Sequence, residues 1–267
     1  MKEKEINEII EERFKTIDKL SHKITKEFNA DDIHDFRVEV KKLRAFLRLL
    51  DIKKEEDESV IPKLLKTFYG YIGIIRNIQL YKHSLFKYIT GHNIDNPGEY
   101  IKLLNDEKAY WKKQAEELMA DNNFHDVKEK IIKELPDRLE KCTIKKFTEG
   151  KLGDLKKQLE DTDDEVGLHT IRKILKDYLY TCDYLIDHAD LPKAISNKDD
   201  LKSLTQMLGD FIDKYMQLEF LQPEHLDRIE DEKEKDNLLQ IKNDFENEKQ
   251  DMKQELQYSL EKLQQQL

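Results

Sequence analysis

Basic side chains recur at helical intervals between residues 32 and 50. They follow one another at alternating steps of three and four residues, at His34, Arg37, Lys41, Arg44 and Arg48. In an α-helix, which turns by about 100° per residue, these five side chains fall within an arc of about 80°. Arginine offers forked donors to phosphate or carboxylate oxygens, lysine a mobile point charge, and histidine a donor that titrates near neutral pH. The spacing therefore predicts a cationic ridge that binds an anion.

A second stretch repeats the beginning of this pattern. His169, Arg172 and Lys176 have the same steps of three and four, and Lys173 flanks them. Like charges at these intervals destabilise a helix, so a ridge of one sign is unusual on an ordinary solvated face. Two such ridges favour a binding function. The alternative is an exposed basic face, or a row of partners for acids on another helix.

Apolar side chains recur at three- and four-residue steps along most of the chain, which is typical of helices with one buried face. Glycine and proline number only 8 and 5 among 267 residues, too few turn residues for a many-stranded fold. The sequence therefore predicts an all-α protein. We expect helices over about 1–28, 32–50, 62–88, 98–120, 123–148, 152–160 and 168–186, and a single long helix from Pro223 onward.

Two landmarks recur at nearly one interval. His34 and His169 are 135 residues apart, and Gly73 and Gly209 are 136 apart. This favours a duplicated helical unit, with a first bundle over 1–150 and a second over 151–267, within one domain. We expect the C-terminal helix to pack along its own bundle; self-association through a coiled coil is the alternative.

The composition restricts where an anion can bind. Charged residues make up 39% of the chain, the formal net charge is −10, and no uninterrupted apolar segment is present. We therefore expect a soluble, cytoplasmic protein without a membrane segment or specific affinity for nucleic acid, which needs a broad cationic surface. Any anion site must be local. The two cysteines, Cys142 and Cys182, have no metal or redox spacing and are expected to be buried thiols.

The ridge residues resemble those of the CHAD (conserved histidine α-helical domain) family, whose units begin with a helix of the form HxxRxxxKxxR. His34, Arg37, Lys41 and Arg44 match the first copy, and His169, Arg172, Lys173 and Lys176 match the second. Downstream, IGIIRNIQ at 72–79 is similar to the family's LGxxRDxD element, and LGDFID at 208–213 to its weaker partner. The resemblance implies two four-helix bundles related by pseudo-twofold symmetry, with the basic helices lining a central groove that binds inorganic polyphosphate without turnover.

This sequence departs from the family pattern at several positions. Leu179 stands where the second ridge often continues with arginine, and Asn77 and Gln79 replace the acids of the RDxD element. The chain is also acidic, whereas many members are strongly basic. Arg76, within the segment IGIIRNIQ at 72–79, is an additional candidate ligand.

On this interpretation each ridge residue has an expected role. Direct phosphate contacts are assigned to Arg37, Lys41, Arg44, Arg172 and Lys176. His34 and His169 are expected to be hydrogen-bond donors that respond to pH. A supporting role is assigned to Arg48, Arg76 and Lys173. Inorganic polyphosphate is the expected partner, and the sequence leaves open whether the protein associates with polyphosphate granules.

Three other functions are conceivable. The His-Asp doublets His34–Asp35 and His125–Asp126 make a metal-dependent phosphohydrolase one alternative. Adjacent side chains on a helix, however, diverge by about 100° and do not readily share one metal ion. A metal held by His34 and His169 would be repelled by the surrounding cations. No GxxxxGK, GxGxxG, GxSxG or HExxH pattern is present, so we expect no enzyme activity, metal or cofactor. An interaction scaffold that holds an acidic protein partner, with weakened polyphosphate affinity, remains the main alternative.

Overall fold

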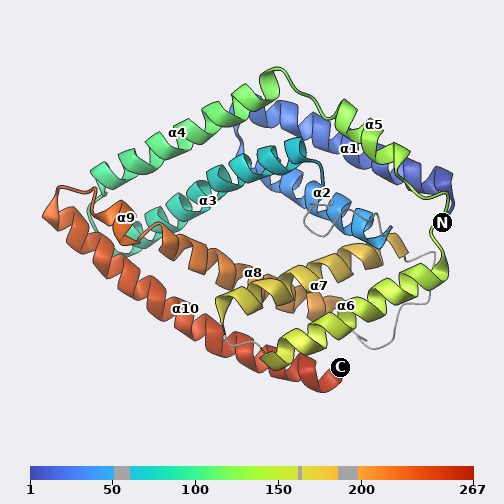
Figure 1. Cartoon of the computed structure of the whole chain (residues 1–267). Helices are drawn as coiled ribbons and strands as arrows, with labels where there is room; N and C mark the ends of the chain where they lie inside the picture. The colour runs from blue at the N-terminus through green and yellow to red at the C-terminus, as the bar shows by residue number, and fades with distance from the viewer. Residues whose placement is uncertain (51–60, 162–163, 186–197) are drawn as a thin grey trace.

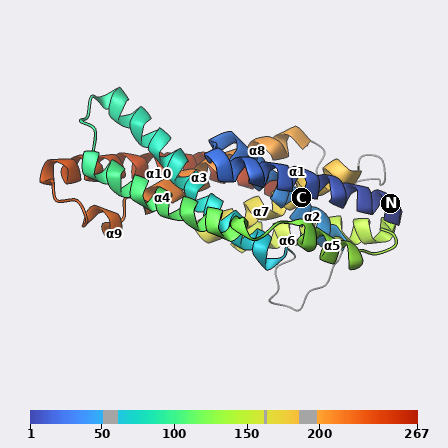
Figure 2. The ribbon, with the colours of Figure 1, turned by 90° about the horizontal axis from the view of Figure 1, so that it is seen from above.

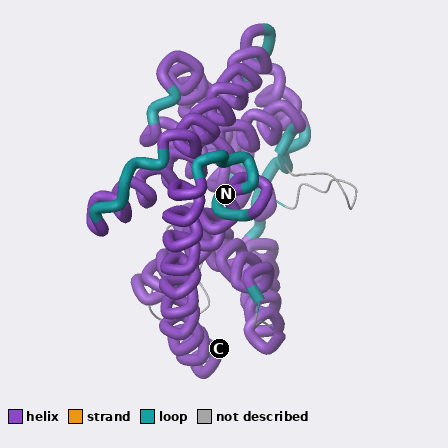
Figure 3. Tube along the Cα trace, turned by 90° about the vertical axis from the view of Figure 1, so that its left-hand side faces the viewer, coloured by secondary structure: helices purple, strands orange, loops and turns teal. Residues whose placement is uncertain are grey.

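The computed structural model describes residues 1–50, 61–161, 164–185 and 198–267, and within these ranges the chain is helical with no strand. Figures 1 and 3 show helix in nearly every described segment. The all-α prediction is confirmed. The described helices are α1 (Glu3–Glu27), α2 (Ala30–Leu49), α3 (Lys63–His92), α4 (Gly98–Ala120), α5 (His125–Lys133), α6 (Lys141–Asp161), α7 (Glu165–Leu185), α8 (Lys198–Glu219), α9 (Pro223–Leu226) and α10 (Glu232–Gln266).

Local signals in the sequence account for the junction that precedes the first ridge. α1 ends at Glu27 and is followed by Phe28, whose backbone adopts the left-handed conformation. Asn29 then caps α2, because its side-chain oxygen accepts hydrogen bonds from the backbone N–H groups of Asp31 and Asp32. The apolar stripe of α2 is buried, so the ridge lies beside it, toward the partly open side of the helix.

The expected helix over 123–148 is wrong, and so is its end before Gly150. α5 stops at Lys133 because Pro136 follows, which has no backbone N–H and disfavours helix at the residue before it. α6 then begins at Lys141 and continues through Gly150 and Gly153. A glycine inside a helix costs only about 1 kcal/mol relative to alanine, which the neighbouring turns outweigh.

The tail contains the predicted long helix, α10, but the helix begins later than expected. The short α9 comes first, and Asp231 caps α10 by accepting a hydrogen bond from the backbone N–H of Glu234. Of the two cysteines, Cys182 is buried as expected, whereas Cys142 is exposed.

The helices form a flat assembly that is broad in Figure 1 and thin when seen from above in Figure 2. The four helices α2, α3, α7 and α8 lie inside, with α1 and α4 along one edge and α6 and α10 along the other (Figure 1). α1 packs on α2 and α4 on α3, as α6 packs on α7 and α10 on α8. This order agrees with a duplicated unit. The division at residues 150 and 151 falls inside α6, and the twofold relation remains a prediction.

Three apolar clusters hold this arrangement together. One lies among α1, α2, α5 and the start of α3, and a second among α6, α7, α8 and the end of α10. The third joins the C-terminal part of α3 and the start of α4 to Leu238, Ile241 and Phe245 of α10. α10 therefore packs against the chain's own helices along its length. In the described ranges, no helix is long and apolar enough to cross a membrane.

Candidate anion-binding site

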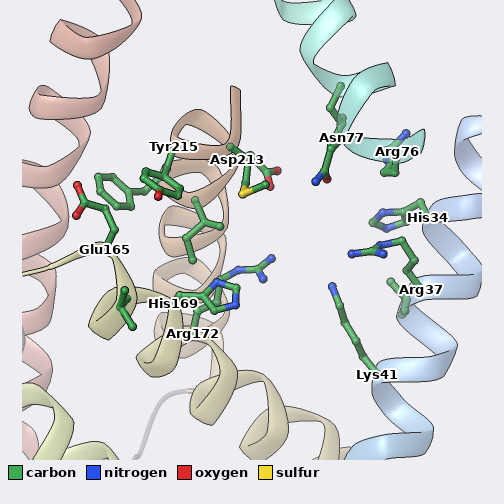
Figure 4. A pocket seen from close by; sticks show the side chains of 16 residues that line it. His34, Arg37, Lys41, Arg76, Asn77, Glu165, His169, Arg172, Asp213 and Tyr215 are labelled. Carbon is green, nitrogen blue, oxygen red and sulfur yellow. The ribbon is translucent and has the colours of Figure 1, made fainter. Parts of the chain in front are cut away.

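The inner helices surround a pocket of about 540 Å³. α2 packs against both α3 and α7, and α8 packs against both α3 and α7, so side chains from all four helices line it. Figure 4 shows basic side chains from α2 and α7 pointing into this space, with Arg76 of α3 beside them. Six of the predicted ligands lie there: His34, Arg37, Lys41, Arg76, His169 and Arg172.

Arg37 reaches the pocket across the backbone of α3. Its guanidinium donates a hydrogen bond of 3.0 Å to the carbonyl oxygen of Tyr69 and lies 4.2 Å from the centroid of that tyrosine ring. A Cβ atom at Gly73 would overlap the same guanidinium. An alanine at this position would therefore force the guanidinium of Arg37 to move from its observed place. Burial lowers the pKa of Arg37, and the neighbouring Arg76 and Arg44 lower it further, partly offset by Tyr69 and Asp213.

Arg172 makes the corresponding contact with α8. A Cβ atom at Gly209 would lie 3.2 Å from its Nη2 atom and 3.3 Å from its Nε atom. That Nε atom is buried and has no hydrogen-bond partner among the described residues. Gly73 and Gly209, which stand out in the sequence by their spacing, are therefore alike in structure. Each leaves room for the guanidinium of an arginine from an adjacent ridge helix.

Lys41 shows that the two ridges face each other. Burial lowers its pKa to about 7, and the next causes are Arg37, Arg172, Lys176 and Arg44. Two of these four cations lie on α7 and two on α2. In its surroundings in this fold, about half of the Lys41 ammonium is therefore deprotonated at neutral pH.

His169 is affected in the same direction. Burial lowers the pKa of its imidazole to about 4, followed by Lys173, Arg172, Lys41 and Arg44. Its ring is therefore neutral at physiological pH in these surroundings. His34 is exposed to solvent at the opposite wall of the pocket (Figure 4).

The other four predicted residues do not line the pocket. Arg44 has a buried Nε atom without a hydrogen-bond partner in the described part of the chain. Burial lowers the pKa values of both Lys173 and Lys176, and nearby arginines add to the effect. Arg48 forms an ion pair with Asp177, which is 129 residues away in sequence. This pair links α2 to α7.

Positive charge in the pocket is not neutralised by ion pairs. Among the described residues, no carboxylate lies within 4.0 Å of the basic nitrogens of Arg37, Lys41, Arg76 or Arg172. Ordinary surface cations find such partners elsewhere in this protein, as Lys42 does with Glu39 at 3.1 Å. An anion would therefore meet cations that have no ion-pair partner within 4.0 Å among the described residues.

Sequence reasoning missed the acidic and aromatic part of the pocket. Asp213 lies in the wall, where burial raises its pKa, while Arg172 and Lys41 act against that rise. Glu165 also lines the pocket and pairs at 3.1 Å with Lys249 of α10, and Tyr215 lies nearby (Figure 4). Helical spacing could have revealed both acids, because Glu165 precedes His169 by four residues and Asp213 follows Gly209 by four.

A metal centre finds no support in the described part of the chain, where no group of three or more histidine, cysteine, aspartate or glutamate side chains is placed to hold one. His125 lies away from the ridges, in a separate hollow that also contains His22 and Lys128.

Comparison with known proteins bears directly on this site. The family model of the CHAD domain matches residues 8–222, which include both ridges and both glycine-bearing helices. The match ends before α10. A comparison with curated proteins gives no match.

Proposed function

The chain belongs to the CHAD family, and from this premise we propose that it binds inorganic polyphosphate, without chemical turnover, on the basic side chains that α2 and α7 direct into the central pocket. The resemblance stated from the ridge residues is thereby confirmed at the level of the family. Binding of polyphosphate is a general property of that family. For this chain, the proposal is supported by the chemistry of the pocket.

The crowding of like charges around Lys41 carries the proposal. A lysine whose pKa falls to about 7 is held against the repulsion of Arg37, Arg172, Lys176 and Arg44. A polyanion placed among these groups would replace repulsion by attraction and restore the charge of the ammonium. The fold thus maintains an arrangement that is unfavourable when empty and favourable when an anion is bound.

The distribution of the cations suits a polymer. Arg44, Lys173 and Lys176 continue the two ridges outside the pocket, so successive phosphates of one chain could be met inside and beyond it. Arginine forks and lysine ammonium groups bind phosphate oxygens without reading any sequence. The net charge of −10 does not oppose this, because beyond about 8 Å other surface charges are largely screened by salt.

Titration calorimetry tests the proposal. Long-chain polyphosphate, tripolyphosphate and a single-stranded oligonucleotide of matched charge are titrated at two salt concentrations. We expect long-chain polyphosphate to bind more tightly than the oligonucleotide at both concentrations and to weaken steeply with salt. Equal affinity for the oligonucleotide would mean a nonspecific polyanion binder, and binding of none of the three would refute the function.

The second candidate is a scaffold for a protein partner, favoured by Asp213 and Glu165, which bring the chain's own negative charge into the pocket. It predicts weak binding of polyphosphate, or none, in the titration above. Self-association through α10 is also untested. If polyphosphate binds, the protein should accompany polyphosphate granules in the cytoplasm, and fluorescence microscopy of a tagged chain would check this.

A further inference from the structure

The central pocket has a second half that a bare polyphosphate chain does not use. α8 and the start of α7 contribute apolar and aromatic side chains to its wall: Val166, Phe211, Ile212, Tyr215 and Met216. We call these five residues the apolar wall. Val166 is 74% exposed, so its side chain is accessible to a ligand in the pocket. Inorganic polyphosphate has no apolar atom to place there.

Asp213 lies between the two halves. Figure 4 shows its carboxyl group between the cations of α2 and α3 on one side and Tyr215 with Glu165 on the other. Asp213 has no ion-pair partner within 4.0 Å in the described part of the chain. A carboxylate in this position repels phosphate but accepts hydrogen bonds from hydroxyl or N–H donors.

The order of groups across the pocket is therefore cations, a hydrogen-bond acceptor, and an apolar surface that includes the half-buried ring of Tyr215. A nucleotide has the matching order, since its phosphates are followed by a ribose with two hydroxyl donors and then by an aromatic base. The volume of about 540 Å³ is within the range of sites that enclose a small organic ligand.

We propose that the pocket takes a ribonucleoside polyphosphate, with its phosphates on Arg37, Lys41 and Arg172, its ribose hydroxyls on Asp213, and its base against Tyr215. This rests on the proposed function, because it uses the same cations, and adds an organic ligand class to it. Met216 and Val166 would border the base, where the methionine sulfur can contact an aromatic ring favourably and the valine adds apolar surface.

The far end of the pocket is held in place by contacts of its own. Lys249 of α10 pairs with Glu165 and lies 5.6 Å from the centroid of the Tyr215 ring. The tyrosine is thus oriented before any ligand arrives, which reduces the entropy lost on binding.

Comparison of ATP and GTP with tripolyphosphate tests this directly. Tripolyphosphate has the same three phosphates but one more ionisable oxygen, so electrostatics alone makes it the better ligand. A stacked base contributes about 1–3 kcal/mol, so we expect at least one of the two nucleotides to bind about tenfold more tightly than tripolyphosphate in calorimetry.

Two substitutions locate the effect. Tyr215→Ala should abolish the preference for the nucleotide and leave tripolyphosphate affinity unchanged, whereas the matched control Tyr215→Phe should retain the preference. Asp213→Asn should strengthen tripolyphosphate binding, because a repulsive charge is lost, and should reduce the preference for ATP over its 2′,3′-dideoxy form.

The outcomes separate the two proposals. If tripolyphosphate and long-chain polyphosphate bind but neither nucleotide exceeds tripolyphosphate, the nucleotide site is refuted and the proposed function stands. If a nucleotide preference exists but survives Tyr215→Ala, the assignment of the base to the apolar wall is refuted. If no phosphate compound binds, both proposals fail.

Discussion

Binding of polyphosphate should draw protons from solution, because Lys41 is only partly charged in the empty pocket. Its pKa is lowered to about 7 by burial and by cations on both ridge helices. At pH 8 the ammonium form is therefore about one-tenth populated. A bound phosphate chain favours that form and returns the pKa toward its ordinary value of 10.5. Binding at pH 8 should then take up about 0.9 proton per site.

The sign of the pH dependence follows from the same shift. The ligand binds best to the protonated lysine, so affinity increases as pH falls. Above pH 7, each further unit should weaken binding by up to about tenfold, until the pH approaches the pKa of the bound form. His169, whose pKa is about 4 without a bound anion, extends this pH dependence of affinity to acidic pH. A neighbouring phosphate raises the pKa of its imidazole as well.

Calorimetry in two phosphate-free buffers of different ionisation enthalpy measures this proton uptake at pH 8. Lys41→Arg is the control, because a guanidinium remains charged and should bind polyphosphate with almost no uptake. At pH 5.5 His169 should contribute to the uptake, which should decrease in His169→Gln. Tight binding by the unaltered protein at pH 8 with no net proton uptake would refute this reasoning.

Three further outcomes are expected. Gly73→Ala should weaken polyphosphate binding at least tenfold in calorimetry, because the new Cβ displaces the guanidinium of Arg37, whereas Gly70→Ala on the same helix meets no atom within 4 Å and should leave affinity unchanged; equal losses would contradict this. Lys41→Met should raise the free energy of unfolding at pH 7 by about 2 kcal/mol in chemical denaturation, since the shift from 10.5 to about 7 amounts to about 4 kcal/mol near neutral pH and solvent screens part of it. This gain should shrink between pH 7 and pH 10.5, where the unaltered lysine loses its charge, and a constant gain would assign the effect to packing instead. Substitutions in the charge run at 231–236 should leave polyphosphate affinity nearly unchanged, and a clear loss there would move the site away from the ridges.

Most helices could be predicted from the sequence because their apolar side chains recur at three- and four-residue steps, the period of an α-helix. α1, α2, α3 and α4 follow such stripes, and Asn29 provides a recognisable cap. The failure between residues 123 and 160 has a physical cause. Pro136 ends the helical segment because a proline lacks a backbone N–H donor, whereas Gly150 only weakens α6, which continues through it.

The cationic half of the site was accessible to sequence reasoning, because its residues lie on two helices with regular spacing. What was not accessible depends on contacts between distant segments. The pairing of Arg48 with Asp177, and the passage of Arg37 over Gly73, arise only when helices pack. The apolar wall was missed for another reason, since Tyr215 and Met216 fit equally well on an ordinary buried stripe.

The most direct test of the central claim is the affinity for long-chain polyphosphate of the double variant Arg37→Ala/Arg172→Ala, measured by calorimetry beside the unaltered protein. A second double variant, Arg138→Ala/Arg228→Ala, removes two exposed arginines that do not line the pocket and has the same net charge. We expect the first variant to lose most of its affinity while its circular dichroism stays helical, and the second to bind nearly as the unaltered protein does. Near-normal affinity in the first variant, or equal losses in both, would contradict the assignment of polyphosphate to the two ridges.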